Sequence, residues 1–164
     1  MGNLKKEFNA TKITVAFIVG LLLGWTIGEA QANPYEWKVV RVLDGDTVEF
    51  VPDATVWKVP AEIAANPRIR VFGVDTPEKD GQCDKEKAAG LAATEFTKKK
   101  VAEAKKVQIY LLPKSDRGTV KAFDKFSNRY LGDVIIDGQS LSKLLIDNGH
   151  ARAYFGEAKQ SWCN

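Results

Sequence analysis

The sequence contains very little histidine and cysteine, and this scarcity excludes several large enzyme classes. Its 164 residues include one histidine, His150, and two cysteines, Cys83 and Cys163. So few imidazole and thiol groups cannot form the His/Cys ligand sets of typical zinc enzymes. We interpret His150 as an ordinary surface or half-buried ring. The chain also lacks a G-x-S-x-G elbow, a P-loop and a G-x-G-x-x-G turn. Any reaction that this chain catalyses must therefore use carboxylates and arginines.

Internal repeats, low-complexity segments and a strong net charge are absent as well. Hydrophobic residues make up 45% and charged residues 27% of the sequence, as in ordinary globular proteins. A chain of this length has room for one domain with a substantial core. The net charge of +3 is compatible with a polyanionic partner but does not require one.

The first 32 residues have the features of a secretory signal. Lysines within the first twelve residues precede an apolar run at 13–28, and an A-Q-A tripeptide ends at Ala32. A basic start, a short apolar stretch and an A-x-A site predict cleavage after Ala32 and export. The alternative is an uncleaved membrane anchor, but this run spans only about 24 Å of a ~30 Å hydrocarbon core. We expect a signal peptide at 1–32 and one folded domain at 33–164.

Both cysteines lie in the part of the chain that we expect to be exported. In an oxidising compartment an even cysteine count favours a bridge between Cys83 and Cys163. Closing that loop would remove roughly 4.5 kcal/mol of unfolded-chain entropy. Two free thiols are the alternative.

Apolar periodicity predicts five strands and two helices in the 33–164 segment. The strands are expected at residues 37–43, 47–51, 68–74, 107–112 and 129–136. An Asp-Gly-Asp turn joins the first two strands as a hairpin. Helices are expected at 84–106 and from Ser140 to Gly149, with a short last strand at 151–155. This order predicts an α+β fold, mainly β with helices: a five-stranded OB-fold barrel with a helix between strands 3 and 4 and a short helix near the C-terminus.

Each predicted helix has a candidate cap and a candidate core-facing side. In the first helix Asp84 is the expected N-cap, and the residues expected to share one apolar face are Ala88, Leu91, Ala92 and Phe96. In the second helix Ser140 is the expected cap, and the residues expected to point inward are Leu141, Leu144 and Leu145.

Carboxylates gather at two predicted turns. Asp44 and Asp46 flank a glycine in the first hairpin, and Asp75, Thr76 and Glu78 surround a proline where the third strand ends. Hard oxygen ligands of this kind suit calcium, which accepts six to eight of them in irregular geometry. Taken singly, each segment is an ordinary turn or strand exit.

Two arginines accompany these carboxylates. Arg70 precedes Asp75 by five residues, and Arg129 begins the last long strand. Arginine grips phosphate in a bidentate fork, so a metal, carboxylates and two arginines are the parts needed for phosphoryl transfer. Side chains alternate along a strand, so Arg70 and Asp75 can face one another only if the chain bends near Gly73 or Val74.

Four segments, taken in order, resemble the staphylococcal nuclease (thermonuclease) family. They are residues 42–48 (VLDGDTV), 70–78 (RVFGVDTPE), 124–129 (DKFSNR) and 144–153 around Gly149. The resemblance covers roughly residues 39–154, and the second segment is its most specific part. It implies a nuclease that cuts DNA or RNA with little sequence preference and leaves 3′-phosphate ends.

The resemblance also implies roles for particular residues. Calcium would be held by Asp46, Asp75 and the backbone carbonyl of Thr76. Glu78 would hold or deprotonate the attacking water. The phosphate and its transition state would be bound by Arg70 and Arg129. Candidate contacts to nucleic acid are Lys125, Phe126 and Tyr154, although a core tyrosine is the alternative for Tyr154.

The sequence departs from the family pattern in three places. One extra residue precedes Arg129 and affects its expected placement, and Arg117 is the weaker alternative for its role. The loop after the second strand is also longer than the usual turn of the family. We expect no counterpart of the C-terminal helix of well-known members, because the chain stops at Asn164. A Cys83–Cys163 bridge would then fasten the tail near the active-site loop. The alternative function is a non-catalytic OB-fold module that binds nucleic acid, either exported or membrane-tethered. We expect a monomer without a stable protein partner.

Overall fold

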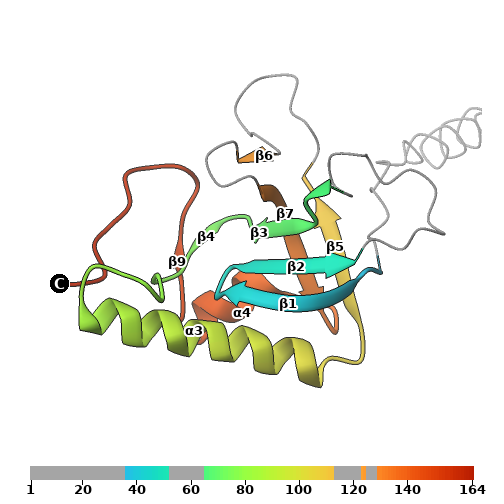
Figure 1. The fold of residues 1–164 in the computed structure, drawn as a ribbon, viewed down its shortest axis with the longest axis horizontal. Helices are drawn as coiled ribbons and strands as arrows, with labels where there is room; N and C mark the ends of the chain where they lie inside the picture. The colour runs from blue at the N-terminus through green and yellow to red at the C-terminus, as the bar shows by residue number, and fades with distance from the viewer. Residues whose placement is uncertain (1–35, 52–64, 113–122, 125–128) are drawn as a thin grey trace, which may run out of the picture. The chain divides into compact units, whose positions relative to one another are not determined.

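The computed structural model describes residues 36–51, 65–112, 123–124 and 129–164, all within the unit formed by residues 33–164 (Figure 1). The predicted signal peptide and the candidate residues Arg117, Lys125 and Phe126 lie outside the described residues. No helix in the described part of the chain is long and apolar enough to span a bilayer.

One curled sheet forms the body of the fold (Figure 1). Its strands are β1 (Lys38–Asp44), β2 (Thr47–Val51), β3 (Arg68–Val71), β5 (Val107–Leu111), β6 (Phe123–Asp124), β7 (Arg129–Ile136) and β8 (Gln139–Ser140). The order is β1-β2-β3-β7-β5, with β6 and β8 also paired to β7. The pairing of β3 with β7 is parallel, and the other pairs are antiparallel. The five longest strands lie where the sequence predicts them, which confirms the α+β, OB-type arrangement.

The core lies on the concave side of the sheet, where alternate strand residues meet the helices. Val48 and Phe50 of β2 are fully buried, and Phe50 stacks on Trp37 with ring centroids 4.8 Å apart. From the helical side, Leu141 and Leu145 complete the same cluster. Burial of these side chains stabilises the fold by about 1.5–3 kcal/mol each.

The predicted third strand is interrupted by a bend, as the proximity of its arginine and aspartate requires. β3 ends at Val71, and Gly73 has φ +83°, a conformation that favours glycine. The chain then enters β4 (Val74–Asp75), which pairs antiparallel with β9 (Arg152–Ala153) in a separate two-stranded sheet. The sequence-predicted bend is therefore confirmed, and the continuous strand 68–74 is replaced by two short ones.

The long helix, α3 (Asp84–Glu103), starts one residue earlier than its predicted cap implies. Its N-cap is Cys83, whose Sγ accepts a hydrogen bond from the backbone N–H of Glu86, and Asp84 is the first helical residue. An aspartate in the first turn still interacts favourably with the helix dipole.

The predicted apolar face of α3 is wrong. Ala88, Leu91 and Ala92 are exposed, and Phe96 is only half buried. The residues that α3 buries are Glu86, Gly90, Ala93, Thr94 and Thr97. This face is small and polar because backbone segments approach it closely: a Cβ on Gly90 would lie 2.5 Å from the carbonyl carbon of Glu78.

The short helix, α4 (Leu141–Asp147), buries Leu141 and Leu145 as predicted, and Leu144 is partly buried. Ser140 occupies the N-cap position, but its hydroxyl does not cap the helix. It contacts Asp133 Oδ1 at 3.0 Å and Ser142 Oγ at 2.7 Å instead, since the adjacent β7 carboxylate is the stronger acceptor.

Candidate functional site

Arg70 joins the two carboxylates that the sequence assigns to a metal. Its Nη1 donates to Asp46 Oδ1 at 2.8 Å, and its Nη2 lies 3.5 Å from Asp75 Oδ1 and 3.3 Å from the carbonyl oxygen of Val74. All three charged side chains are buried, with exposed fractions of 11% for Arg70, 2% for Asp46 and 7% for Asp75. The hairpin turn and the bend after β3 therefore bring residues 24 to 29 positions apart into one cluster.

Asp46 is the most deeply buried acid of this cluster. Its Oδ1 also accepts the Thr47 hydroxyl at 3.1 Å, and its Oδ2 faces the backbone N–H of Thr76 at 3.4 Å. Burial raises the pKa of Asp46 to about 7, although the Arg70 guanidinium lowers it; the nearby Asp44 raises it further. An ionised Asp46 in this position would be stabilised by an additional cation.

Arg129 reaches the same cluster through a residue that the sequence analysis missed. Its Nη1 donates to Thr47 Oγ1 at 2.8 Å, and the Thr47 hydroxyl in turn donates to Asp46. Thr47 is fully buried directly after the turn. The position of Thr47 beside Asp46 in the first motif could have identified it as a site residue. A single hydroxyl in a strand, however, usually has only a structural role. The extra residue before Arg129 does not keep this arginine away from Asp46.

Thr76 and Glu78 lie directly after β4, on a segment that forms a turn between Glu78 and Gly81. Thr76 is buried at 3% exposure, whereas the side chain of Glu78 is 54% exposed. The Glu78 carbonyl accepts the N–H of Gly81 at 3.0 Å, and the backbone at this point rests against Gly90 of α3. The segment therefore presents the Glu78 carboxylate at the surface, close to the buried Asp46 and Asp75.

The C-terminal tail, residues 157–164, supplies two further contacts to the site. Lys159 Nζ lies 2.6 Å from Asp75 Oδ1 and 3.8 Å from Glu78 Oε1, and Trp162 Nε1 donates to Asp75 Oδ2 at 3.2 Å. Trp162 is itself covered by Arg152, whose guanidinium carbon lies 3.7 Å from the centroid of the indole ring system. Neither Lys159 nor Trp162 could be predicted as a partner of Asp75 from the sequence, because both contacts depend on how the tail folds back.

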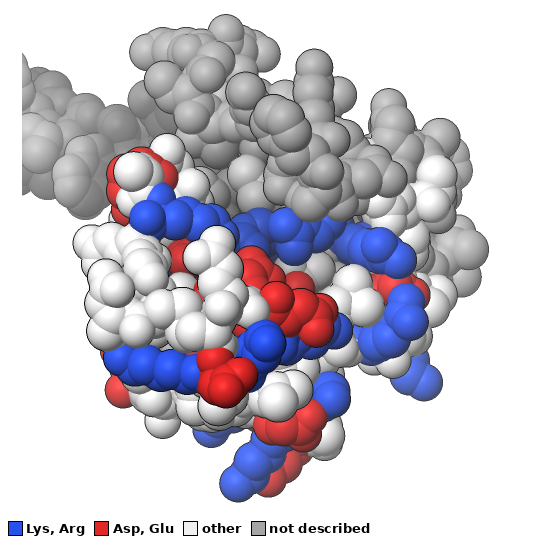
Figure 2. Space-filling view, turned by 60° about the vertical axis from the view of Figure 1, so that its left-hand side comes forward, with Lys and Arg blue, Asp and Glu red and all other residues white. Residues whose placement is uncertain are grey.

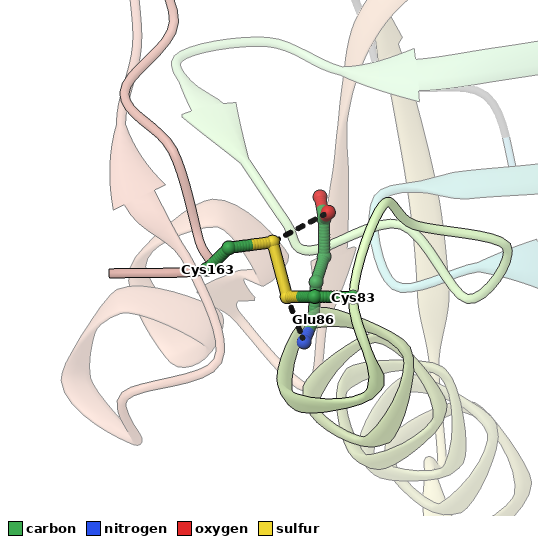
Figure 3. Close-up of side chains that lie close together, drawn as sticks. All are labelled: Cys83, Glu86 and Cys163. Atoms are coloured by element: carbon green, nitrogen blue, oxygen red, sulfur yellow. Dashed lines mark hydrogen bonds between the residues drawn. A yellow bond between two sulfur atoms is a disulfide. The ribbon is translucent and has the colours of Figure 1, made fainter.

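A disulfide attaches the C-terminal tail to the start of α3 (Figure 3). Cys163 is bonded to Cys83, the N-cap residue of α3, with Cα atoms 6.0 Å apart. Glu86 lies beside the bridge, with its Oε2 3.7 Å from Cys163 Sγ and accepting the backbone N–H of Gln82 at 2.8 Å. The predicted pairing is confirmed, and Figure 1 shows the tail turning back toward the start of α3.

Tyr154 lies at the edge of the site and is half buried. Its backbone N–H donates to the carbonyl of Gly73 at 3.0 Å, and Lys159 Nζ lies 5.8 Å from its ring centroid. The remaining candidate, His150, packs against Phe96 with centroids 4.5 Å apart and is half buried. That placement agrees with the interpretation of His150 as an ordinary ring.

A hollow of about 430 Å³ opens between the loop after β4 and the tail. Its lining residues are Asp75, Thr76, Glu78, Asp80, Gly81, Gln82, Glu86, Lys159, Gln160, Ser161 and Trp162. On this side of the molecule acidic side chains gather between two rows of lysines and arginines (Figure 2). A cation beside the carboxylates and a phosphate beside the basic rows would both find complementary charge.

The donors near this hollow fit a hard cation. Asp46 and Asp75 offer carboxylate oxygens, and Asp46 is buried where a cation would favour its charged form. Within the described ranges, three residues place potential metal-ligand atoms within 4.8 Å of one another: Cys83, Glu86 and Cys163. The two sulfur atoms of this group are bonded to each other in the disulfide and do not serve as metal ligands. Asp46 and Asp75 are instead linked through Arg70, which contacts both carboxylates.

Comparison with known proteins agrees with this geometry. Residues 68–162 match the family model described as staphylococcal nuclease homologue. The chain is also 28% identical over 160 residues to the thermonuclease of Staphylococcus hyicus, an alignment that covers 93% of this chain and 83% of that protein. The matched segment contains the bend, both arginines and the tail contacts to Asp75. The chain therefore belongs to the staphylococcal nuclease family.

Proposed function

We propose that this protein is an exported, calcium-dependent nuclease that hydrolyses phosphodiester bonds of DNA or RNA. The observation that carries the proposal is the buried Asp46–Arg70–Asp75 cluster with Arg129 attached through Thr47. Two arginines beside buried carboxylates match the charge of a phosphate held next to a cation. Membership of the nuclease family and the similarity to a thermonuclease support the same activity.

Each residue has a role that its position allows. Asp46, Asp75 and the carbonyl oxygen of Thr76 would hold the cation, which when bound would polarise the phosphate and neutralise developing negative charge. Glu78, exposed at the rim, accepts a proton from the water that attacks phosphorus. The bond from phosphorus to the 5′-oxygen breaks, and the leaving oxygen takes a proton from solvent. Arg70 and Arg129 stabilise the charge that builds on the phosphate oxygens.

The decisive test is calcium-dependent cleavage of single-stranded DNA. The purified protein should cut in calcium and stop when a chelator is added. Glu78→Gln should lower kcat by two orders of magnitude or more, a loss of about 3 kcal/mol of transition-state stabilisation. Binding of DNA without cleavage by the wild-type protein would instead identify a non-catalytic module.

A matched control is available on α3. Glu103 is 61% exposed and lies 3.9 Å from Lys99, whereas Glu78 is 54% exposed and lies 3.8 Å from Lys159. Glu103→Gln removes an equivalent surface charge and should leave kcat within a factor of two. An equal loss in both variants would mean that Glu78 acts through overall charge and not as a base.

The chemistry of the products tests the direction of cleavage. Loss of the 5′-oxygen leaves a phosphate on the 3′ end, so a polymerase should extend the products only after treatment with a phosphatase. Products that are extended directly would contradict this part of the proposal.

Export is supported by the disulfide, since such bonds persist in oxidising compartments. Sequencing the N-terminus of the protein recovered outside the cytoplasm should give Asn33 as the first residue. Recovery of the intact N-terminus in the membrane fraction would favour the anchored alternative.

A further inference from the structure

Both carboxylate oxygens of Asp75 already have partners in this arrangement. Its Oδ1 is shared by Arg70 and Lys159, at 3.5 Å and 2.6 Å, and its Oδ2 accepts the indole N–H of Trp162. A calcium ion that takes a carboxylate oxygen needs that oxygen at about 2.3–2.6 Å, without a positive group in between. An ion that coordinates Oδ1 must therefore displace at least one of the two cationic groups that contact this oxygen.

Lys159 is the donor that can leave at least cost. Arg70 is buried and is also bonded to Asp46, so removing it from Asp75 would strand a buried charge. Trp162 is covered by Arg152 and lies next to the disulfide. Lys159 is 48% exposed, and its ammonium group on a flexible stem can be rehydrated by a short movement.

The tail nevertheless keeps Lys159 close to the acids. On one side the tail follows β9, which pairs with β4 at Asp75 itself. On the other side it is bonded covalently to the start of α3, and Arg152 Nη1 donates to the carbonyl of Ser161 at 3.0 Å. A group tethered at both sides has a high effective concentration at its binding position.

We propose that Lys159 is a built-in competitor for the divalent cation, and that the Cys83–Cys163 disulfide sets the strength of this competition. The ammonium group neutralises Asp75 and Glu78 while the cation is absent and must be displaced for the cation to bind. The tail thereby lowers the metal affinity of the site, and reduction of the disulfide raises it. This inference rests on the proposed function, in which the same carboxylates hold calcium.

Titration calorimetry with calcium alone, without nucleic acid, tests the proposal on the purified protein. Lys159→Met should bind calcium roughly three- to tenfold more tightly than the wild type, because one partner of the lost pair is buried. The calcium-induced rise in Tm should increase in the same variant. Its Tm in chelator should fall slightly, because Asp75 loses a partner, and its circular dichroism should show an intact fold.

Lys98→Met is the matched control. Lys98 is 50% exposed and lies 2.7 Å from the exposed Glu95; its exposed fraction and ion-pair distance are close to the 48% and 2.6 Å of Lys159. This substitution removes the same charge from the same chain without touching the site, and calcium affinity should stay within a factor of two. An equal gain in both variants would assign the effect to net charge and overturn the role of Lys159.

The disulfide is tested by a cycle of variants. Cys83→Ser combined with Cys163→Ser should tighten calcium binding when Lys159 is present and should change it little in the Lys159→Met background. Serine is chosen because it preserves an N-cap at position 83. A gain of the same size in both backgrounds would show that the bridge acts on the metal independently of Lys159.

Calcium binding by these variants distinguishes failure of the inference from failure of the proposed function. If the wild type and Lys159→Met bind calcium equally, or if the variant binds more weakly, the inference is overturned while calcium binding stands. If none of these proteins binds calcium, the calcium part of the proposed function fails and the inference fails with it.

Discussion

At the scale of single residues, the protonation of Asp46 links the fold to the site. Burial, the largest influence, raises the pKa of this carboxyl from 3.8 to about 7. Between about pH 4 and pH 7 the folded protein keeps a proton on Asp46 that the unfolded chain has lost. This group therefore contributes stability that is fully present below pH 3.8 and is lost as the pH rises through 7.

Calcium binding should consequently depend on pH. We predict that affinity rises with pH up to about 7 and levels off above it, because below pH 7 the ion must displace the Asp46 proton. Calorimetry in two buffers of different ionisation enthalpy should show release of nearly one proton at pH 6 and almost none at pH 8. An affinity that does not change from pH 5.5 to 8 would mean that Asp46 is already ionised before the ion binds.

The Thr47 hydroxyl should matter for activity as well as for stability. Thr47→Val removes the group between Arg129 and Asp46 and leaves both partners less satisfied. We predict a loss of about 1–3 kcal/mol in the free energy of unfolding and a lower kcat, because Arg129 is no longer oriented. Thr47→Ser keeps the hydroxyl and should therefore retain most of the stability, measured by urea unfolding, and most of the kcat, measured in cleavage assays. A fully active valine variant would remove Thr47 from the site.

At the scale of elements, the sequence predicted the strands well and the packing of the long helix poorly. Alternating β-branched residues determine which face of a strand is buried, so β2, β3 and β7 follow from local pattern. On α3, three of the four apolar residues predicted to face the core, Ala88, Leu91 and Ala92, face solvent instead, and Phe96 is half buried. The hidden face is built from Gly90, Ala93 and Thr97, because two backbone segments lie against it. A close approach of the backbone depends on tertiary structure and leaves no periodic pattern of apolar residues in the sequence, so this face could not be predicted from the sequence.

In the candidate site, likewise, contacts within one short segment could be predicted and contacts between distant segments could not. The meeting of Arg70 with Asp75 could be predicted once a glycine bend was assumed, because both lie in one short segment. The contacts of Lys159 and Trp162 with Asp75 could not, since they join residues more than eighty positions apart through a disulfide and a pair of short strands.

Gly90 provides a test of the close approach. Alanine normally stabilises a helix by up to about 1 kcal/mol relative to glycine, but a Cβ here would lie 2.5 Å from the Glu78 carbonyl carbon and the Lys79 nitrogen. We predict that Gly90→Ala destabilises the protein by roughly 1–3 kcal/mol and lowers kcat, because the segment that carries Glu78 must move. Ala88→Gly, at an exposed position of the same helix, should cost only the ordinary propensity and leave kcat unchanged. Increased stability of Gly90→Ala would show that the helix and the loop are not in contact.

At the scale of the whole molecule, the disulfide closes a loop between positions 80 residues apart and so restrains most of the fold. We predict that replacing both cysteines by serine lowers the free energy of unfolding by about 2–4 kcal/mol in urea titrations. In the variant, limited proteolysis should remove the tail before it cuts the sheet. A change below 0.5 kcal/mol would mean that the unfolded chain is already compact around this loop.

The support of the hairpin turn by α3 has a mechanical consequence. The Thr97 hydroxyl donates to the carbonyl of Gly45 at 2.7 Å, and the segment with Glu78 rests on Gly90 of the same helix, about two turns earlier. Arg70 and Arg129 belong instead to β3 and β7, which are hydrogen-bonded neighbours. A displacement of α3 would therefore disturb both segments that carry the candidate acids Asp46 and Glu78 at the same time, although they lie far apart in the sequence.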